Sequence, residues 1–418
     1  MPDPTVPDPT VPDPTVPDPT VPDQDVYEAL WSALDRHLPA ALDLRRRLHR
    51  EPDLSGDEAA TRDMVLAALP GAGAAVKTAE TGAVLRIGGP GPAIGVRGEM
   101  DALPVTEETG VAWASARPGV MHACGHDTHL AALVAVAGAL AETGPPVPLL
   151  AVLQPREETY PSGAQDITTS GVLDSEQCAA MVGVHVQPLL ARGEVACTAG
   201  GVNGSSDEFE IVVRGRSGHA AYPHLTNDAL LAMSEIVVAL QSVVSRSVDP
   251  MAPAVVGVSS FSAGNAANVI AGTARATGTV RALASSTREL IHRRITEVAE
   301  FVARAHACTA SVTITHGEPV LDNDPALVRS ITHQLDRRGL AVSGNLRSLG
   351  SDDFSYFCER VPSAMLFVGT GTSEPLHSSH FLPDDGDVRA VATALMAAYL
   401  GTVAALAEPA GARGVPAG

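Results

Sequence analysis

Residues 147–158 read VPLLAVLQPREE, a short apolar run that ends in two adjacent glutamates. A continuous run of Leu, Ala and Val bounded by prolines is typical of a strand buried inside a sheet. Paired glutamates usually mark a solvated helix face, but here they follow a buried strand and a Gln-Pro pair. The stretch therefore predicts a strand that delivers Glu157 and Glu158 to the carboxyl edge of a sheet.

Comparable apolar runs occur on both sides of this stretch, and helical segments separate them. The other predicted strands are AVLRIG (83–88), AIGVRGEMD (93–101), MVGVHV (181–186) and AMLFVG (364–369). Helical spacing runs from Val26 to about Pro52 and again through residues 128–144, where Gly144 should end the helix. This alternation predicts an α/β fold in which a mixed sheet has helices on both faces, an α/β/α arrangement.

The pattern changes between Asp207 and His316. The expected order there is strand, helix, strand, strand, helix, strand, which is the ferredoxin-like β-α-β-β-α-β unit. Ser286 followed by Glu289 predicts a capping box at the start of its second helix. We interpret residues 207–316 as a domain inserted into a larger domain made of residues 26–206 and 317–410.

Both ends of the chain are expected to be disordered. Residues 2–21 contain four copies of PDPTV, and residues 22–26 read PDQDV. Proline removes backbone donors and the repeated aspartates repel one another, so residues 1–25 should form an extended tail without a fixed fold. We interpret this tail as inert, with a docking role as the alternative. Residues 411–418 are expected to form a second disordered tail.

The composition argues against several classes of protein. The 418-residue chain is long enough for two domains, and its net charge of -20 argues against nucleic acid and anionic membranes as partners. We expect neither a secretory signal nor a membrane span, because no basic and apolar leader and no apolar run of about 18 residues is present. The odd number and irregular spacing of the cysteines favour free thiols in the cytoplasm: Cys124, Cys178, Cys197, Cys308 and Cys358.

Residues 122–129, HACGHDTH, contain the densest group of possible metal ligands. Cys124 and His126 offer a thiolate and an imidazole, and Gly125 permits the tight backbone that would bring both to one ion. A single histidine or cysteine usually has a structural role, so the inference depends on partners elsewhere in the chain. The remaining polar residues of this stretch are expected to support the ligands or the helix start: His122, Asp127 and His129.

Polar residues that follow other predicted strands complete the ligand set. Glu158, His185 and His377 join Cys124 and His126 to make five ligands. Five is too many for one tetrahedral zinc that keeps a water position, but it suits a pair of divalent ions. The mixed donor set is compatible with Zn or Mn, and also with Co or Ni. The sequence therefore predicts a two-metal hydrolytic centre.

Several motifs together are similar in order and spacing to those of a known family. They are LHREPDLSGDE (48–58), MDALPVTEETG (100–110), GVMHACGHDTH (119–129), QPREE (154–158), SGHAAYPH (217–224), ANVI (267–270), GSDDFSYF (350–357) and LHSSHF (376–381). From about residue 42 to 400 the chain resembles the di-metal amidohydrolases related to hippurate hydrolase. That group includes N-acyl-amino-acid amidohydrolases (aminoacylases) and auxin-conjugate hydrolases, within the aminoacylase/carboxypeptidase metallopeptidase clan.

The resemblance implies roles for residues in the larger domain. It implies that the five ligands named above bind the metals, that Glu157 is the general base and that Asp101 orients the metal site. In place of the family's usual residues the chain has Glu99 for Asp, Asp352 for Glu, Arg156 for a small residue and Ala271 for Pro. None of these differences removes a ligand, so they bear on the shape of the pocket.

The resemblance also implies roles for the inserted domain. His219 is expected to contribute to catalysis, in related enzymes often at the partner subunit's site. Arg281 and Asn268 are expected to hold the carboxylate and the carbonyl of the substrate. The inserted domain would then act as a lid and as the dimerisation surface of a homodimer.

The predicted activity is metal-dependent hydrolysis of the amide bond of N-acyl amino acids, which yields a carboxylate and a free amine. The alternative on the same scaffold is a dipeptidase or carboxypeptidase. A metal-binding pseudoenzyme would lack a ligand or the base, and the sequence lacks neither. The sequence has no G-x-S-x-G elbow of a serine hydrolase, and no P-loop or G-x-G-x-x-G of a nucleotide-binding protein.

Overall fold

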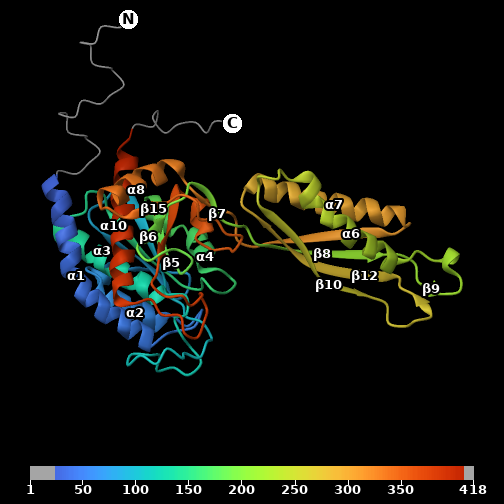
Figure 1. Ribbon diagram of the computed structural model, residues 1–418, viewed down its shortest axis with the longest axis horizontal. Coiled ribbons are helices and arrows are strands. Elements are labelled where there is room, and N and C mark those ends of the chain that lie inside the picture. Colours follow the sequence, from blue (N-terminus) through green and yellow to red (C-terminus); the bar gives the residue numbers. More distant parts are fainter. Residues whose placement is uncertain (1–23, 409–418) are drawn as a thin grey trace, which may run out of the picture.

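A mixed eight-stranded sheet forms the centre of the larger of two lobes in the computed structural model, which describes residues 24–408 (Figure 1). Its strands are β1 (Val76–Thr78), β2 (Gly82–Ile87), β3 (Ala93–Glu99), β4 (Leu149–Gln154), β5 (Cys178–Gln187), β6 (Glu194–Ala196), β15 (Ala341–Ser343) and β16 (Ser363–Gly369). They lie in the order β1-β2-β4-β3-β5-β16-β6-β15. The pairs β1–β2, β2–β4 and β6–β16 are antiparallel and the others are parallel. All five predicted strands belong to this sheet.

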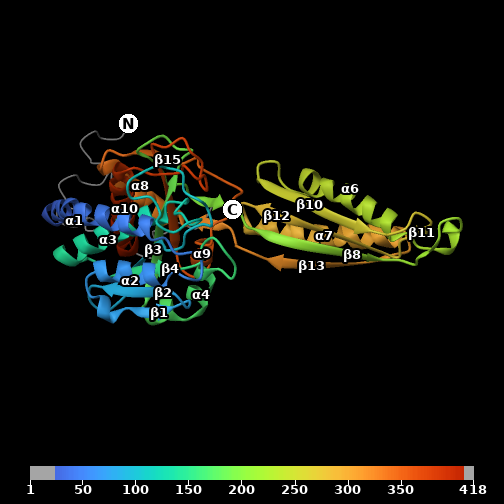
Figure 2. The same ribbon diagram turned by 90° about the horizontal axis from the view of Figure 1, so that it is seen from below.

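Helices cover both faces of the sheet, which confirms the prediction of a mixed α/β fold (Figures 1 and 2). Alternate side chains of β4 enter two cores: Leu149, Ala151 and Leu153 enter one, and Leu150 and Val152 enter the other. The first core includes α1 (Gln24–Arg50), α3 (His126–Thr143), α8 (Pro325–Arg337) and α10 (Asp385–Ala407). The second includes α4 (Gly163–Thr169), α5 (Val172–Ser175) and α9 (Ser355–Cys358). Two further helical segments are α2 (Ala59–Ala68) and a 3-10 turn (Ala72–Ala74).

The ends of the described chain differ slightly from the prediction. Helix α1 begins at Gln24, so residues 24 and 25 are helical and do not belong to the predicted tail. Asp25 lies in the first turn, where its negative charge suits the positive end of the helix dipole. The rest of the tail predicted for residues 1–25, and the tail predicted for 411–418, lie outside the described residues.

Two glycines fix the ends of α3, and the end at Gly144 was predicted from the sequence. Gly125 precedes the helix with a φ of 85°, and Gly144 follows it with a φ of 83°. Both values lie in the left-handed region that favours glycine. A Cβ on Gly125 would also lie 2.6 Å from the Val186 side chain, so no larger residue fits between Cys124 and His126.

A four-stranded antiparallel sheet with two helices forms the smaller lobe. Its elements in chain order are β8 (Asp207–Arg214), α6 (Ala229–Ser247), β10 (Ala254–Ala263), β12 (Thr273–Ala282), α7 (Ser285–Ala305) and β13 (Thr309–His316), and its strand order is β10-β12-β8-β13. Both helices contribute to one core with the sheet. A short ribbon of β9 (Gly218–His219) and β11 (Val269–Ile270), with a 3-10 turn (Pro223–Leu225), lies at the end farthest from the large sheet (Figures 1 and 2). At the opposite end, β7 (Gly200–Asn203) pairs with β14 (Leu321–Asn323).

The predicted capping box in the smaller lobe is wrong. Helix α7 begins at Ser285, its N-cap position is Ala284, and no side chain caps it. Strand β12 runs to Ala282, so only two residues separate it from α7. The chain therefore enters the helix two residues too early for Ser286 to be the cap.

Helices α6 and α10 are long and apolar enough to span a membrane by length and composition alone. The most apolar window of α10 is 67% buried and that of α6 is 33% buried. Helices that pack into a protein core share this composition, so the property is weak evidence for a span. Helix α10 contributes residues to a core of the larger lobe, and helix α6 contributes residues to the core of the smaller lobe.

Candidate metal centre and active site

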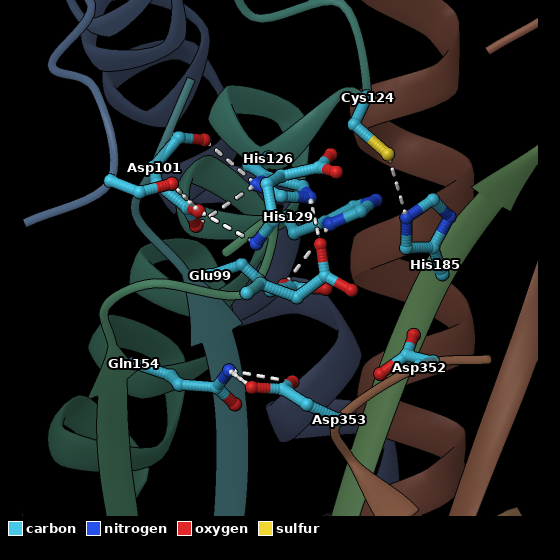
Figure 3. Close-up of polar contacts among 12 residues, drawn as sticks. Glu99, Asp101, Cys124, His126, His129, Gln154, His185, Asp352 and Asp353 are labelled. Carbon is cyan, nitrogen blue, oxygen red and sulfur yellow. Dashed lines mark hydrogen bonds and ion pairs between the residues drawn. The ribbon is translucent and has the colours of Figure 1, made fainter. Parts of the chain in front are cut away.

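The structure brings the five predicted ligands and the predicted base together at the carboxyl edge of the large sheet. Figure 3 shows three of these ligands, Cys124, His126 and His185. Strands β3, β4 and β5 end there and α3 begins there. Three groups have ligand atoms within 4.8 Å of one another: Cys124 with His126 and His185, Cys124 with Glu158 and His377, and His126 with Glu157 and Glu158. A cleft of about 320 Å³ is lined by five of these six residues: Cys124, Glu157, Glu158, His185 and His377.

Asp101 orients His126. The His126 Nδ1 donates to the Asp101 backbone carbonyl at 2.8 Å, which leaves Nε2 free to face Glu157 Oε2 at 3.7 Å. Asp101 Oδ2 accepts from Ser55 Oγ at 2.7 Å and from the Glu158 backbone N–H at 2.9 Å. Burial works to lower the pKa of His126, but Asp101 and Glu99 outweigh it and raise that pKa to about 10. The negative charges that favour a proton on His126 would equally favour a metal cation at this position.

Backbone contacts hold His185 and His377, two of the other predicted ligands. The His185 Nδ1 bonds to the Val186 carbonyl at 2.6 Å, which leaves Nε2 3.3 Å from Cys124 Sγ (Figure 3). His377 has a φ of 68° and donates its backbone N–H to Ala123 O at 2.8 Å. Its Nε2 lies 3.3 Å from Glu158 Oε1. A backbone hydrogen bond thus joins His377 to the segment that contains Cys124.

Unpartnered polar atoms show that this donor set fits divalent ions. Among the described residues, His126 Nε2 and Asp101 Oδ1 are buried and make no hydrogen bond, and Glu158 Oε1 is buried with His377 Nε2 at 3.3 Å. Such atoms are costly in a protein interior unless a water or an ion contacts them. Imidazole, thiolate and carboxylate are the donors that Zn and related metals take. Ligand atoms of His126, Glu157 and Glu158 lie within 4.8 Å of one another, so the residues present fit a metal centre.

Glu157 differs from Glu158 in its surroundings. Burial, together with the negative charges of Asp352 and Glu158, raises the pKa of Glu157 well above its usual value. Its side chain is 12% exposed, and it lies on the cleft beside the ligands. A carboxylate in this position can accept a proton from a group bound in the cleft.

The sequence did not reveal a buried hydrogen-bond network beside the cleft (Figure 3). Arg97 bonds to Gln154 at 2.9 Å, to Asp352 at 3.1 Å and to Asp353 at 2.8 Å, and it also pairs with Glu99. The other oxygen of Glu99 lies 3.1 Å from His129 Nδ1. The signal that could have identified it is an arginine inside the apolar strand AIGVRGE.

His129 is not free to bind a metal. Its Nε2 accepts the Val186 backbone N–H at 3.0 Å while its Nδ1 faces Glu99, so both ring nitrogens have partners. The expectation of a supporting role agrees with this geometry. His122 is also buried, and burial lowers its pKa to about 4.

The residues at which this chain differs from the family that it resembles lie in different parts of the structure. Asp352 lines the cleft, whereas Glu99 is fully buried beside it. The Arg156 side chain bonds to Glu80 and to the Pro161 carbonyl, and it is not among the cleft residues. Only Asp352 among these differences borders the cleft directly.

The predicted residues of the smaller lobe are divided between its two ends. Arg281 lies at the end near the cleft, where its Nη1 bonds to Ser351 Oγ at 3.2 Å. His219 and Asn268 lie at the far end, where β9 pairs with β11 and the Ala220 N–H donates to Asn268 O at 3.0 Å (Figure 1). Strand β12 separates the two ends by about 30 Å at the usual rise per residue. Within one chain, His219 and Asn268 are therefore not brought to the cleft.

Known proteins resemble this chain over most of its length. Residues 95–400 match the model of Peptidase family M20/M25/M40. An N-acetyldiaminopimelate deacetylase of Halalkalibacterium halodurans is 35% identical over 87% of this chain and 100% of its own length. An N-acetyl-L-cysteine deacetylase of Bacillus subtilis is 34% identical over 85% of each chain.

A solved structure agrees with these matches. The Bacillus subtilis YXEP protein, described as a dinuclear metal binding peptidase from the M20 family, superposes with a TM-score of 0.76 and 28% sequence identity. The alignment covers 88% of this chain and 99% of that one. The predicted resemblance and the predicted class, a hydrolase of amide bonds, are confirmed. The chain belongs to Peptidase family M20/M25/M40.

Proposed function

We propose that this chain is a metal-dependent amidohydrolase that cleaves N-acyl amino acids into a carboxylic acid and a free amino acid. The observation that carries the proposal is the convergence of the five predicted ligands, among them the buried and unpartnered His126 Nε2, beside the protonatable carboxylate of Glu157. Deacetylase relatives at 34–35% identity support the same class of substrate.

Cys124, His126, Glu158, His185 and His377 would hold two divalent ions, Zn or Mn, with Co or Ni also compatible. Bound there, the ions would supply Lewis acidity and would lower the pKa of a bound water towards about 7. Asp101 would keep His126 in the tautomer that presents Nε2.

Glu157 is the proposed proton carrier of the reaction. It would take a proton from the attacking water and return it to the leaving amine, which must be protonated because an amide anion is too basic to leave. Arg281 would hold the substrate carboxylate at the end of the cleft near Ser351. His219 would donate to the developing oxyanion, and Asn268 would bond to the substrate carbonyl.

We propose that the chain acts as a homodimer and that residues 207–316 form a ferredoxin-like lid inserted between residues 26–206 and 317–410. Strand β10 is an edge strand, and Val255 and Phe261 on it are 45% and 43% exposed. Val238 on α6 is 73% exposed. Exposed apolar side chains beside a free strand edge favour pairing with a second copy.

We further propose a cytoplasmic location. All five cysteines are unpaired, which suits a reducing compartment.

The test is a panel of N-acetyl, N-benzoyl and longer N-acyl amino acids, assayed for released amine with enzyme loaded with Mn, Co or Zn. Free-amine dipeptides in the same panel distinguish an amidohydrolase from a dipeptidase. Glu157→Gln should lower kcat by about 100-fold or more while metal content is retained. Glu158→Gln should instead lower metal content. Failure of the native chain to cleave any N-acyl amino acid would exclude the proposal.

A further inference from the structure

The cleft lined by the proposed metal ligands is also lined by an arginine that has no role in the proposed amide hydrolysis. Arg347 lines the cleft together with Glu157, Glu158 and His377. It belongs to the segment between β15 and α9, which also supplies Ser351 and Asp352 to the cleft. An exposed guanidinium at this cleft is able to bind an anionic group of a substrate.

Backbone contacts fix the segment around Arg347. The Ser348 N–H donates to Val202 O at 2.8 Å, and the Gly204 N–H donates to Ser348 O at 3.0 Å. Asn203 and Ser348 form a parallel bridge, so the segment extends the edge of β7. The arginine is therefore held in place although its side chain is exposed.

The Arg347 guanidinium is anchored by neutral groups. It donates to the carbonyls of Ala199, at 3.1 Å, and of Gly201. Within residues 24–408 it makes no ion pair within 4.0 Å, in contrast to the buried Arg45 and Arg97, which both pair with carboxylates. Burial raises the pKa of Asp322, and the charge of Arg347 opposes this rise without cancelling it. A guanidinium with five N–H donors thus keeps unused donors and an uncompensated charge at the cleft.

Arg281 is a second cation at the same cleft, through its bond to Ser351, which also lines it. An N-acyl amino acid with a neutral side chain carries one carboxylate, and Arg281 is sufficient to bind it. One arginine that lines the cleft and a second that bonds to a cleft residue match a substrate with two anionic groups, because a guanidinium binds a carboxylate with two parallel hydrogen bonds.

We propose that Arg347 determines substrate specificity by binding a side-chain carboxylate, so that the preferred substrates are N-acyl derivatives of dicarboxylic amino acids. This inference rests on the proposed N-acyl amino acid amidohydrolase activity. Arg347 is a binding residue here, and no catalytic step depends on it.

The experiment compares N-acetyl-L-glutamate with N-acetyl-L-glutamine, which match in size and differ in one charge. The native, metal-loaded enzyme should cleave the glutamate compound with a kcat/KM at least tenfold higher. Arg347→Met should reduce that preference to about twofold or less, with most of the loss in KM. Arg347→Lys should keep part of the preference, because it retains the charge and loses the planar fork. Arg329→Met, an exposed arginine of α8 outside the cleft, is the matched control and should behave as the native enzyme does.

Three outcomes would overturn the inference while leaving the proposed activity intact. The native enzyme could cleave both compounds equally well. Arg347→Met could retain the preference for glutamate. It could also lose both substrates to the same degree, which would place the α-carboxylate rather than a side-chain carboxylate on Arg347. If the native enzyme cleaves neither these compounds nor any other N-acyl amino acid, the proposed function itself fails.

Discussion

Arg97 is the most heavily constrained charged residue in the larger lobe. Its guanidinium is fully buried and contacts three carboxylates from two distant parts of the chain. Glu99 is one methylene longer, and Asp352 one methylene shorter, than the residues usual in the resembling family. Both carboxylates bond to the same guanidinium, so the two changes offset one another in reach.

Replacing Arg97 with Met should destabilise the fold, because three buried carboxylates would lose their compensating charge. We expect a loss of about 3–5 kcal/mol in the free energy of unfolding, measured by urea denaturation. Arg97→Lys keeps the charge but not the fork, so it should lose less. A loss below about 1 kcal/mol in Arg97→Met would show that the network does not stabilise the lobe.

Glu107 gives a pH-dependent contribution to stability. Burial acts to raise its pKa, but hydrogen bonds from His49, from the Ser115 N–H and from Thr109 lower the pKa from 4.5 to about 2. A carboxylate with a depressed pKa stabilises the fold above its unfolded pKa, and this contribution is lost as the pH falls from 4.5 through about 2. The shift corresponds to at most about 3 kcal/mol.

Glu107→Gln should therefore be less stable than the native chain at pH 7, and the difference should shrink as the pH falls towards 3. Urea unfolding at both pH values, with ligands and ionic strength held constant, measures the change. Equal stability differences at the two pH values would contradict the assignment, because the carboxylate charge would then play no part.

The residues of the site could be predicted only where they follow a local pattern. Glu158, His185 and the pair Cys124 and His126 stand at strand ends or a helix start, and these positions can be inferred from apolar runs. Arg97 and Asp352 are 255 residues apart, and no local pattern links them. Tertiary contacts of this kind appear only when the fold is known.

At the scale of elements, the connection between the lobes depends on one buried aspartate. Asp207, the first residue of β8, bonds to Arg288 at 2.7 and 2.5 Å and to His292 at 2.9 Å. It also accepts the Gly317 backbone N–H at 3.2 Å. Although burial acts to raise the pKa of Asp207, Arg288 and His292 hold it below its usual value. Both chain segments that cross between the lobes are thereby joined at one carboxylate.

Asp207→Asn should loosen this connection. We expect a loss of about 2–3 kcal/mol, the range for hydrogen bonds to charged groups, and faster hydrogen exchange in residues 204–206 and 317–320. Glu210→Gln on the same strand is the control, because its pair with Arg275 is exposed and should contribute less than about 1 kcal/mol. Equal effects of the two variants would show that Asp207 has no special role.

Elements with strong periodicity were predicted well, and their ends less so. The apolar runs located five of the eight strands of the large sheet, and Gly144 ended α3 as expected. The capping box at Ser286 failed because the length of β12 fixes where α7 begins. The smaller lobe thus shows that strand pairing can override a local capping signal.

At the scale of the whole molecule, the predicted site residues are spread over both lobes. Arg281 lies near the cleft, whereas His219 and Asn268 lie about 30 Å away along β12. A homodimer joined through the exposed edge of β10 would let the far end of one smaller lobe approach the cleft of the other chain. The proposed site would then need two copies, and light scattering should show a dimer.

Mixing two inactive variants tests whether His219 acts across the dimer. Glu157→Gln removes the base of its own cleft, and His219→Ala removes the histidine that would serve the partner's cleft. A heterodimer has one cleft with both groups intact, so random mixing should restore about a quarter of native activity, since half of the dimers are mixed and one of their two clefts is complete. Glu157→Gln mixed with Cys124→Ser should restore none, because both changes lie in the larger lobe and each disables its own cleft. If the first mixture also stays inactive while tagged heterodimers form, His219 does not act on the partner's substrate.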